Sequence, residues 1–594
     1  MKKEIPKADY LFEVGWEVCH QVGGIYTVIK SKSARIYDLY KENYFLIGPY
    51  FAEEAAIKFE GKPIPKEFTK IFNELKKDKI VPHFGKWIID GIAVNTILID
   101  FSNYKKDTNK IKTDLWKDFK VDSLGSKEMF DEWVVWSTIA GRILEGVRKT
   151  LKGKIVVQFH EYLSGPGLLY LKKNKVKIGT VFTTHATYLG RKMASEGINL
   201  YDVMDKINPL DEAYRYKIQE RYTLEKAAAL NADVFTTVSD ITALEAKYTI
   251  GKKPDLVLPN GLDMGRFPTM EERAIKHSKF KKQIMEFVRI FFFPYYRFDI
   301  ENSLIYFIAG RCEIKNKGID IFIESLGKLN KKLMKEKDSK TIIALFWVPA
   351  DVNGINLNLL NNKINYEGIE NFMDRSLGNL KSDIIDSILN QKLPTTKKLF
   401  EGSFYYQMKK KMIEFKKKGK PQLVTHNLKD DGCDMLSALK KAGLNNTSSD
   451  KVKVIYYPVY LTGADGLIDL SYYDAIMGTN FGVFPSYYEP WGYTPLESGA
   501  LGVPSVTTDL SGFGKYILKK HKGCKGISVL KRQNISDQKA IVNLTSMMYN
   551  FSKLTKEDRI KVKLNAKHIA ESADWKNMVN YYVMAHNKSL KKIK

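Results

Sequence analysis

The chain has 594 residues, of which 44% are hydrophobic and 12% aromatic, so it can build several packed domains and is not a disordered polypeptide. No run of about 18 uncharged apolar residues is present, and we expect no transmembrane helix. Asp9, Glu13 and Glu17 interrupt any apolar segment of a secretory signal near the basic start. The four cysteines lie far apart without a CxxC pair. This pattern argues against a disulfide scaffold and a zinc site and favours a cytoplasmic protein.

The 95 Lys and Arg residues outnumber the 68 Asp and Glu residues, which gives a formal net charge of +27. Such a charge can attract polyanions, including nucleic acids. Most basic residues are scattered lysines, however, and no helix-turn-helix, zinc-finger or RNA-recognition motif is present. We therefore interpret the charge as a solvated lysine-rich surface and expect neither a specific nucleic-acid partner nor a membrane partner.

Short apolar runs of β-branched and aromatic residues recur along the chain, each followed by a longer helical pattern. Runs without strict alternation are typical of strands buried on both faces of a parallel sheet. Their alternation with helices predicts an α/β fold with helices on both sides of parallel sheets. The predicted strands are 10–14, 44–48, 155–159, 179–183 and 232–236 in the first half, and 305–309, 342–346, 452–456, 481–484 and 504–507 in the second half.

The two halves predict two Rossmann-like domains that face each other across a deep cleft. We place the first domain at 1–290 and the second at 291–574, because an apolar strand opens the second half shortly after this point. A polar segment rich in Asn and Lys, 353–422, is predicted to be a helical insertion in the second domain. The last helix, 575–594, carries an apolar stripe and is predicted to pack back on the first domain.

Most predicted strands end in polar residues, among them His160, His185, Asn260, Arg311 and Glu489. Open parallel sheets bind ligands at the carboxyl ends of their strands. These side chains are therefore expected to gather at one site between the domains.

Gly23 and Gly24 follow the first predicted strand and precede a helical pattern. A Gly-Gly turn at a helix start can present backbone N–H groups to a phosphate, although such turns are also common structural features. The segment is not GxGxxG, and the chain contains no GxxxxGK[ST] segment. A nicotinamide cofactor and a P-loop nucleotide therefore both lack their motifs.

Arg311 follows the strand predicted at 305–309, and Lys317 comes six residues later. A guanidinium can hold a phosphate with two hydrogen bonds, and an ammonium adds a compact charge. Without an Asp-rich cluster nearby, this pair would stabilise a diphosphate leaving group without a metal. A structural salt bridge is an open alternative for either residue.

Glu489 ends a predicted strand, and Glu497 falls eight residues later in a predicted helix. Two carboxylates permit the acid/base pair of a glycosidase, but no second signal favours water as the nucleophile. Glu497 could equally cap the helix or form a salt bridge. Gly492 and Thr494, near the start of the helix, again favour phosphate binding.

Several separate segments together resemble the glycogen synthase family of the eukaryotic type, whose members are retaining GT-B glycosyltransferases. The segments are 12–18, 22–28, 160–161, 183–187, 189–191, 259–262, 316–318 and 486–497. The resemblance implies a GT-B fold and transfer of glucose from UDP-glucose to the non-reducing 4-OH end of an α-1,4-glucan. It also implies retention of configuration and a reaction that needs no metal and no other cofactor.

The resemblance implies roles for individual residues. The implied catalytic residues are Glu489, Arg311, Lys317 and His185, with the two basic residues stabilising charge on the leaving diphosphate. The implied donor contacts are Gly23, Gly24, Arg191, Asn260, Tyr472, Trp491, Gly492, Tyr493, Thr494 and Glu497. Tyr472 would stack on the uracil. The implied acceptor-side residues are His160 and Glu161.

Two of the departures from the family pattern bear directly on ligand binding. The pair His20-Gln21 stands where Asn-Lys is usual, which removes one ammonium contact to the donor. Regulated animal and fungal enzymes bind glucose 6-phosphate through an Arg-rich helix, whereas Asn565 and His568 stand at two of those positions here. His277 and Lys281 match residues of that pocket and, with His568, would form a weakened site. We therefore expect little or no activation by glucose 6-phosphate.

The resemblance also implies partners. Tetrameric relatives imply self-association through the 353–422 insertion, so we expect a homo-oligomer, and a glycogenin-like primer protein is a further implied partner. Two alternatives remain open. One is another retaining GT-B glucosyltransferase that uses ADP-glucose or a small acceptor, and the other is a catalytically weak glucan-binding paralogue. The presence of Glu489, Arg311 and Lys317 counts against the paralogue, whereas Gln21 counts slightly for it.

Overall fold

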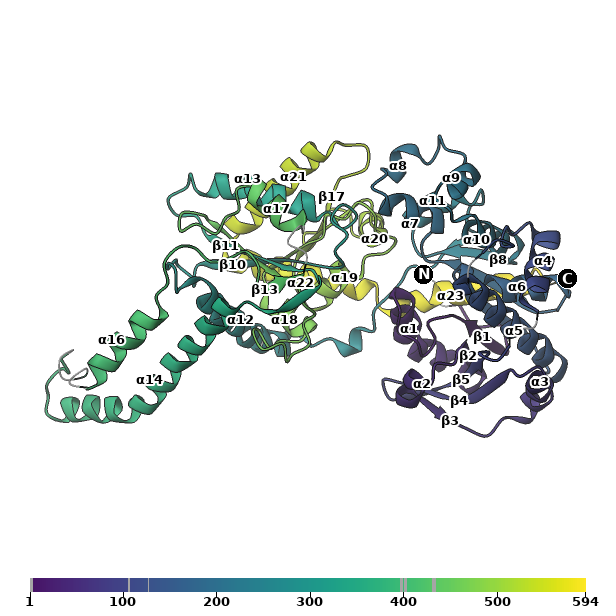
Figure 1. Cartoon of the computed structure of the whole chain (residues 1–594), viewed down its shortest axis with the longest axis horizontal. Coiled ribbons are helices and arrows are strands. Elements are labelled where there is room, and N and C mark those ends of the chain that lie inside the picture. The colour runs from purple at the N-terminus through teal and green to yellow at the C-terminus, as the bar shows by residue number, and fades with distance from the viewer. Residues whose placement is uncertain are drawn as a thin grey trace.

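The computed structural model describes residues 4–104, 107–126, 128–395, 399, 403–429 and 434–593. Cys433, one of the four cysteines, lies outside the described residues, as do parts of the basic start and of the 353–422 insertion. The chain forms two lobes, and a helical arm projects from the second lobe (Figure 1). No helix of the described residues is long and apolar enough to cross a membrane.

The first lobe is built on a nine-stranded sheet in the order β3-β4-β5-β2-β1-β6-β7-β8-β9. Its strands are β1 (Tyr10–Val14), β2 (Tyr44–Pro49), β3 (Phe59–Gly61), β4 (Val81–Ile89), β5 (Ile92–Asp100), β6 (Ile155–His160), β7 (Gly179–Thr184), β8 (Val234–Thr237) and β9 (Leu256–Val257). From β5 onward in this order each pair is parallel, whereas β4 is antiparallel to both of its neighbours.

Helices cover the first sheet. They are α1 (Gly24–Tyr40), α2 (Ala52–Lys58), α3 (Lys66–Lys77), α4 (Thr108–Phe119), α5 (Glu128–Thr150), α6 (Gly165–Lys173), α7 (Tyr188–Ser195), α8 (Leu200–Val203), α9 (Pro209–Arg215), α10 (Gln219–Asn231) and α11 (Asp240–Thr249). The predicted alternation of buried parallel strands and helices is therefore confirmed in this lobe.

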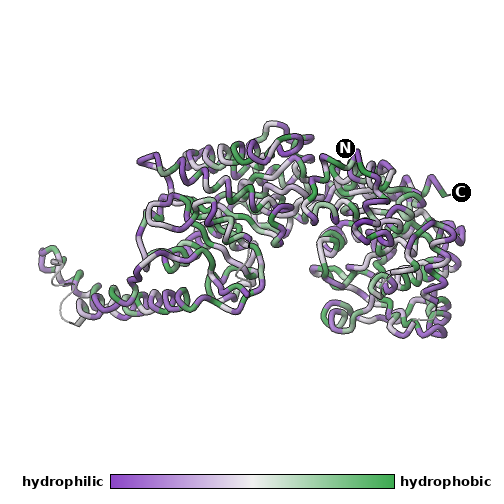
Figure 2. Tube along the Cα trace, turned by 45° about the horizontal axis from the view of Figure 1, so that its top comes forward, coloured by the Kyte–Doolittle hydropathy of each residue, from purple (hydrophilic) through white to green (hydrophobic). Residues whose placement is uncertain are grey.

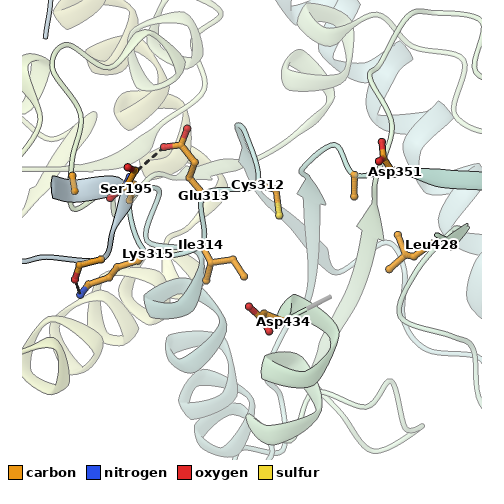
Figure 3. A pocket seen from close by; sticks show the side chains of 12 residues that line it. Ser195, Cys312, Glu313, Ile314, Lys315, Asp351, Leu428 and Asp434 are labelled. Carbon is orange, nitrogen blue, oxygen red and sulfur yellow. Dashed lines mark hydrogen bonds between the residues drawn. The ribbon is translucent and has the colours of Figure 1, made fainter. Parts of the chain in front are cut away.

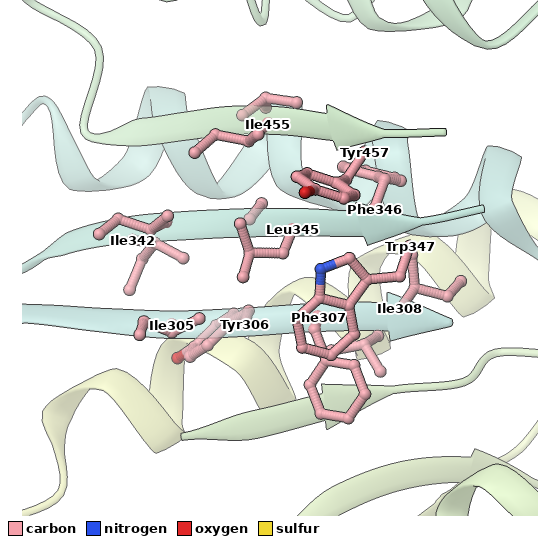
Figure 4. Close-up of a cluster of buried hydrophobic side chains, with 14 of the residues drawn as sticks. Ile305, Tyr306, Phe307, Ile308, Ile342, Leu345, Phe346, Trp347, Ile455 and Tyr457 are labelled. Atoms are coloured by element: carbon pink, nitrogen blue, oxygen red, sulfur yellow. The ribbon is translucent and has the colours of Figure 1, made fainter. Parts of the chain in front are cut away.

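The second lobe is built on a six-stranded parallel sheet in the order β14-β11-β10-β15-β16-β17. Its strands are β10 (Ser303–Ala309), β11 (Thr341–Trp347), β14 (Val452–Tyr457), β15 (Phe481–Val483), β16 (Ser505–Thr508) and β17 (Ile527–Leu530), and a small antiparallel pair joins β12 (Val352–Ile355) to β13 (His426–Leu428). Side chains such as Phe307, Leu345 and Ile455 fill the core around this sheet (Figure 4). Burial on both faces explains why these strands read as continuous apolar runs.

The helices of the second lobe follow the same alternation. They are α12 (Met270–Phe292), α13 (Ile319–Leu333), α14 (Leu357–Leu389), α16 (Ser403–Phe415), α17 (Asp434–Lys441), α18 (Tyr472–Gly478), α19 (Tyr493–Ala500), α20 (Gly512–Lys520), α21 (Asp537–Lys553) and α22 (Lys556–Ser572). Two parallel α/β sheets with helices on their faces confirm the predicted fold class.

Helix α12 differs from the predicted boundary between residues 290 and 291. Its apolar face, which includes Phe280, Ile284, Phe287 and Phe291, is buried in the core of the second lobe. The helix therefore packs with the second lobe although much of it precedes residue 290. The boundary was placed too late because the apolar stripe of α12 could be matched to either core from the sequence.

The chain crosses between the lobes at two neighbouring points. The Leu262 N–H donates to the Ala573 carbonyl at 3.1 Å, and the Trp575 N–H donates to the Leu262 carbonyl at 2.9 Å. A Cβ on Gly261 would stand 2.9 Å from the Ala573 carbonyl oxygen, so a larger residue would push the two crossings apart. The lobes are thus joined by a pair of hydrogen-bonded segments.

After the second crossing, helix α23 (Trp575–Leu590) returns to the first lobe, where it contacts α1, β6, β7 and β8 (Figure 1). Its stripe of Trp575, Met578 and Tyr582 is buried. The Trp575 indole also donates to the Ser31 hydroxyl on α1 at 2.8 Å. The C-terminal helix thereby becomes part of the core of the first lobe.

Helices α14 and α16 form the projecting arm and run side by side (Figures 1 and 2). Hydrophilic and hydrophobic residues mix along the arm in Figure 2. Several large apolar side chains on α14 are exposed, including Leu377 at 60% and Ile388 at 64%. Both helices fall in the segment predicted to be a helical insertion.

Candidate active site

A cavity of about 720 Å³ lies between the lobes, next to the carboxyl ends of both parallel sheets. From the first lobe it is lined by the predicted residues Gly23, Gly24, His185, Arg191 and Asn260. From the second lobe it is lined by Arg311, Lys317, Glu489, Trp491, Gly492 and Tyr493. The fold therefore brings these residues together, although they are spread over most of the chain.

Lys317 and Glu489 form the closest charged pair in this cavity. The Lys317 Nζ donates to Glu489 Oε2 at 2.7 Å, and each side chain is 21% exposed. The Asn316 carbonyl accepts the N–H groups of Tyr487 and Tyr488, which ties the loop after β10 to the segment before Glu489. This backbone connection places an ammonium and a carboxylate side by side at the edge of the sheet.

Arg311 extends into the cleft from the same loop. Its side chain is 76% exposed, and it forms an ion pair with Glu313 Oε1 at 2.9 Å. An exposed ion pair of this kind contributes little to stability. The guanidinium is therefore available to turn toward an anionic ligand at low cost.

Helix α19 begins at Tyr493, four residues after Glu489, and its start lines the same cavity. Gly492 precedes it with φ of 105°, and a Cβ there would stand 3.0 Å from the Ser511 hydroxyl. No side chain of the described residues caps the helix, so the N–H groups of Tyr493 and Thr494 are available to an anion, whereas Pro495 has no N–H. Thr494, in its first turn, lines a small adjoining pocket together with Lys317 and Glu489.

Glu497 lies behind this helix start and is held by two tyrosines. Its carboxylate accepts hydrogen bonds from the Tyr472 and Tyr473 hydroxyls, each at 3.1 Å. Burial raises the pKa of Glu497 above its usual range. The structure thus brings Glu497 and Tyr472 together, and their roles as nucleotide contacts remain predictions. It adds Tyr473 to the pair as a residue that was not predicted.

Glu17 changes the prediction made for the Gly-Gly turn. Its carboxylate accepts the N–H groups of Gly23 and Tyr26, both at 2.8 Å, at the start of α1. Gly23 therefore does not offer its N–H to a phosphate in this structure, because a carboxylate of the chain already holds it. Gly24 remains open, with nothing within 4 Å of the position a Cβ would occupy.

His160 and Glu161, the predicted acceptor-side residues, are buried. The Glu161 carboxylate accepts the N–H groups of His185 and Ala186 at 2.8 and 3.2 Å. Its backbone has φ of 63°, a strained value for a non-glycine residue. Burial raises the pKa of the Glu161 carboxyl group. Glu161 therefore holds the loop that carries His185 and does not line the cleft cavity.

Two further lining residues carry polar groups that suit a ligand. The Asn260 side chain is 3% exposed, and its Oδ1 has no hydrogen-bond partner among the described residues. A buried oxygen without a partner is costly, so a hydroxyl or amide donor from a ligand would stabilise it. Arg191, on α7, brings a cation to the same wall of the cavity.

A second cavity of about 590 Å³ adjoins the first and shares Ser195, Glu313 and Asn316 with it (Figure 3). Lys315 bridges the lobes here, because its ammonium donates to the Gly197 carbonyl at 2.5 Å. Asp351 and Asp434 lie on the side of the second lobe. The cleft therefore continues beyond the space around Glu489.

Among the described residues, no group of three or more His, Cys, Asp or Glu side chains is arranged to hold a metal ion. His20 and Gln21, the departure from the family pattern, both contact Glu54: His20 through its ring and Gln21 through its N–H at 3.2 Å. Gln21 is exposed and adds no cation to the cleft. Metal independence remains a prediction.

A cluster of cations surrounds His277, which lies on α12. The Lys563 Nζ lies 3.3 Å from His277 Nε2, and His277 Nδ1 donates to the Met477 carbonyl at 2.6 Å. Burial and the charges of Arg273, Lys281 and Arg559 lower the pKa of Lys563 to about 7. Lys281 thus joins His277, as the sequence analysis expected.

His568 does not join this cluster. Its ring packs against the His521 ring, with centroids 6.0 Å apart. Lys567 is engaged elsewhere, since its ammonium donates to the Pro268 carbonyl at 2.5 Å. Lys563, beside His277, therefore takes the third place in the candidate phosphate pocket, for which the sequence predicted His568.

Two Rossmann-like lobes with a ligand cavity between the carboxyl ends of their sheets define the GT-B class of glycosyltransferases. The fold resembles the catalytic domain of starch synthase IV from Arabidopsis thaliana, bound to ADP and acarbose, with a TM-score of 0.54 and 11% identity over 98% of this chain and 100% of that one. The chain belongs to the glycogen synthase family, whose model matches residues 13–594.

The sequence is 36% identical to the liver glycogen [starch] synthase of Homo sapiens over 595 aligned positions, which cover 99% of this chain and 84% of that protein. It is 35% identical to the glycogen [starch] synthase of Neurospora crassa over the same share of each chain. The predicted family membership and the assignment as a glycosyltransferase are thereby confirmed.

Proposed function

We propose that the chain transfers glucose from UDP-glucose to the non-reducing 4-OH end of an α-1,4-glucan such as glycogen, with retention of configuration. The observation that carries the proposal is the Lys317–Glu489 pair at 2.7 Å beside the uncapped start of α19. A cation and a helix start suit a diphosphate, and a carboxylate suits a sugar that becomes positively charged. Membership of the family supports the same donor and acceptor.

In this reaction the bond between sugar C1 and the diphosphate oxygen breaks, and a bond from C1 to the acceptor oxygen forms on the same face. Lys317 and Arg311 would stabilise the negative charge that develops on the leaving UDP. The leaving phosphate oxygen takes the proton of the acceptor hydroxyl, so no separate strong base is required. Such preorganised contacts contribute about 3 to 4 kcal/mol each to the transition state.

The direct test measures UDP release from UDP-glucose with glycogen as acceptor. We expect turnover with UDP-glucose, much slower turnover with ADP-glucose, and no change when EDTA is added. Preference for ADP-glucose or a requirement for Mg²⁺ would contradict the proposed donor or the metal-free scheme. Absence of turnover with either donor would support a glucan-binding paralogue.

The arm of α14 and α16 is proposed to mediate self-association into a homo-oligomer. Met373, Leu377, Ile384 and Ile388 are exposed and fall on one face of α14 by their spacing. Their burial against a second copy would remove apolar surface from water, which stabilises by about 25 cal/mol per Å². A glycogenin-like primer remains a further proposed partner.

We expect light scattering at micromolar concentration to give an oligomer for the unchanged chain and a monomer for the double variant Leu377→Asp/Ile388→Asp. Ser382→Asp, an exposed polar position on the same helix, is the matched control and should stay oligomeric. A monomeric unchanged chain would refute the role of the arm.

The cation cluster around His277 is proposed to bind a sugar phosphate weakly. Because Lys563 has a pKa of about 7, it is charged below this pH and loses its charge as the pH rises above it. His277 stays neutral in this range, since burial lowers its pKa to about 3. Affinity for a phosphate dianion should therefore fall between pH 6.5 and pH 8.5.

At pH 8.5 we expect millimolar glucose 6-phosphate to raise the rate at subsaturating UDP-glucose by less than about twofold, which is smaller than the effect of a typical allosteric ligand. At pH 6.5 we expect a larger rise. Lys563→Met should remove the pH dependence of the ratio of activated to basal rate. Lys561→Met, on an exposed part of the same helix, should not. A saturable several-fold activation that is equal at both pH values would overturn this prediction.

A further inference from the structure

Four buried side chains form a hydrogen-bonded chain that runs from the interior of the first lobe to the cleft. The Lys32 ammonium on α1 contacts the Glu13 carboxylate on β1, and Glu13 Oε2 lies 3.1 Å from His160 Nε2 at the end of β6. His160 Nδ1 lies 3.1 Å from His185 Nε2. Exposed fractions are 0% for Lys32 and Glu13, 1% for His160 and 7% for His185.

The protons in this chain follow from the charge on Glu13. Burial opposes ionisation of Glu13, but the neighbouring Lys32 ammonium and the hydrogen bonds from His160 and Lys32 lower its pKa to about 2. An ionised carboxylate only accepts hydrogen bonds, so His160 Nε2 must carry a hydrogen. Burial lowers the pKa of His160, which leaves the ring neutral with a lone pair on Nδ1.

The same reasoning on donors and acceptors places the hydrogen on the His185 ring. His160 Nδ1 can only accept, so His185 Nε2 must donate and therefore carries the hydrogen. Burial, followed by the nearby His160 and Lys32, lowers the pKa of His185 well below its usual range. A neutral ring with its hydrogen on Nε2 has a lone pair on Nδ1. His185 lines the cleft cavity.

We propose that Glu13 is a positioning residue which, through His160, fixes His185 in the tautomer whose Nδ1 accepts a hydrogen bond from a hydroxyl group of the donor sugar. Glu13 touches no substrate itself and acts through two imidazole rings. The inference rests on the proposed function, since a sugar hydroxyl must be present in the cleft. The loop of His185 is held independently by Glu161, which accepts its N–H at 2.8 Å.

Several other side chains lie next to these four residues, and they do not change the assigned hydrogen positions. Tyr582 of α23 packs over the Lys32 ammonium, 4.8 Å from the ring centroid. His586 on the same helix pairs with Gln158 at 2.8 Å and with the Tyr40 hydroxyl at 3.2 Å, and burial lowers its pKa to about 3. Arg191 brings a positive charge from the cleft side and favours the neutral form of His185.

The test combines variants that keep the net charge of the protein with UDP-glucose analogues that each lack one hydroxyl group. Glu13→Gln alone would leave the Lys32 charge buried without a partner and could unfold the lobe. The main variant is therefore Glu13→Gln/Lys32→Met, and His160→Phe is a second variant that removes the link without changing the net charge. The matched control is Lys112→Met/Asp131→Asn, which neutralises a pair at 3.0 Å in the same lobe but outside the cavity lining.

Each protein is assayed with UDP-glucose and with the four UDP-deoxyglucoses that lack one hydroxyl at position 2, 3, 4 or 6. With UDP-glucose we expect kcat/KM to fall by about 10- to 100-fold in both variants, the scale of one lost hydrogen bond in a desolvated site, and to stay unchanged in the control. With the one deoxy donor that lacks the hydroxyl bonded to His185, kcat/KM of the variants and of the unchanged protein should agree within about twofold.

An equal loss on all five donors would show that Glu13 has only a structural role and would overturn the inference, as would no loss on UDP-glucose. In both cases the unchanged chain still turns over UDP-glucose, so the proposed function stands. If the unchanged chain itself fails to release UDP from UDP-glucose, the proposed function fails and this inference falls with it.

Discussion

Glu489→Gln is expected to lower kcat for glucosyl transfer by about 10³-fold, the upper scale for losing one preorganised electrostatic contact. The substitution keeps the shape of the side chain but removes the negative charge that is proposed to face the reacting sugar. It also removes the ionic partner of Lys317, which lies 2.7 Å away. The pair is partly exposed to the cleft, so the change should alter the chemistry far more than the fold.

The measurement is kcat for UDP release, with UDP affinity measured separately by titration calorimetry. UDP affinity should change little, because the helix start at α19 and Glu497 remain in place. Glu336→Gln, which removes a half-buried carboxylate paired with Lys553 in the second lobe outside the cavity lining, should leave both quantities unchanged. A Glu489→Gln variant that keeps most of its kcat would remove Glu489 from the catalytic assignment.

The sequence predicted the central strands of both sheets well because burial on two faces leaves a simple pattern. The strand predicted at 10–14 is β1, and the one at 305–309 lies within β10. Strands β4 and β5 at the antiparallel edge were not predicted. β4 contains Pro82 and Gly85, residue types that argue against a strand, and only contact with β3 shows why Gly85 is required.

The residues at the candidate site could be found from their position after strands, but the directions of their side chains could not. His160 ends β6 and Glu161 follows it, which is where site residues are expected, yet both side chains are buried. Glu161 has φ of 63°, which turns its carboxylate toward the backbone of the next loop. Sequence spacing carries no information on such a turn.

Buried charges were the least predictable feature. Glu13 lies in a strand whose other residues are apolar, and its partner Lys32 is on the adjacent helix, so neither residue shows by itself that it is fully buried. Breaking one partner of such a pair costs about 3 to 5 kcal/mol. The role of Glu17, in the loop before α1, was likewise not predictable because only the folded chain shows which N–H groups its carboxylate accepts.

Arg311→Ala and Lys317→Ala are each expected to lower kcat/KM for UDP-glucose by about 10²-fold, since each removes a donor to the charge that develops on the leaving diphosphate. The two variants should differ in how the loss of kcat/KM is divided between kcat and KM. Arg311 is 76% exposed and its ion pair with Glu313 is open to solvent, so its loss should raise KM as well as lower kcat. Lys317 is held against Glu489, so its loss should act mainly on kcat.

Lys328→Ala, on the exposed face of the helix that follows this loop, is the matched control and should leave kcat/KM unchanged. The comparison is decisive because a general effect of lowering the positive charge of the chain would appear in all three variants. Such an effect would also weaken with added salt, since exposed charges are screened within about 8 Å at physiological ionic strength. If Arg311→Ala and Lys317→Ala each lose less than about threefold, the diphosphate is stabilised by other groups, and the uncapped start of α19 becomes the main anion contact.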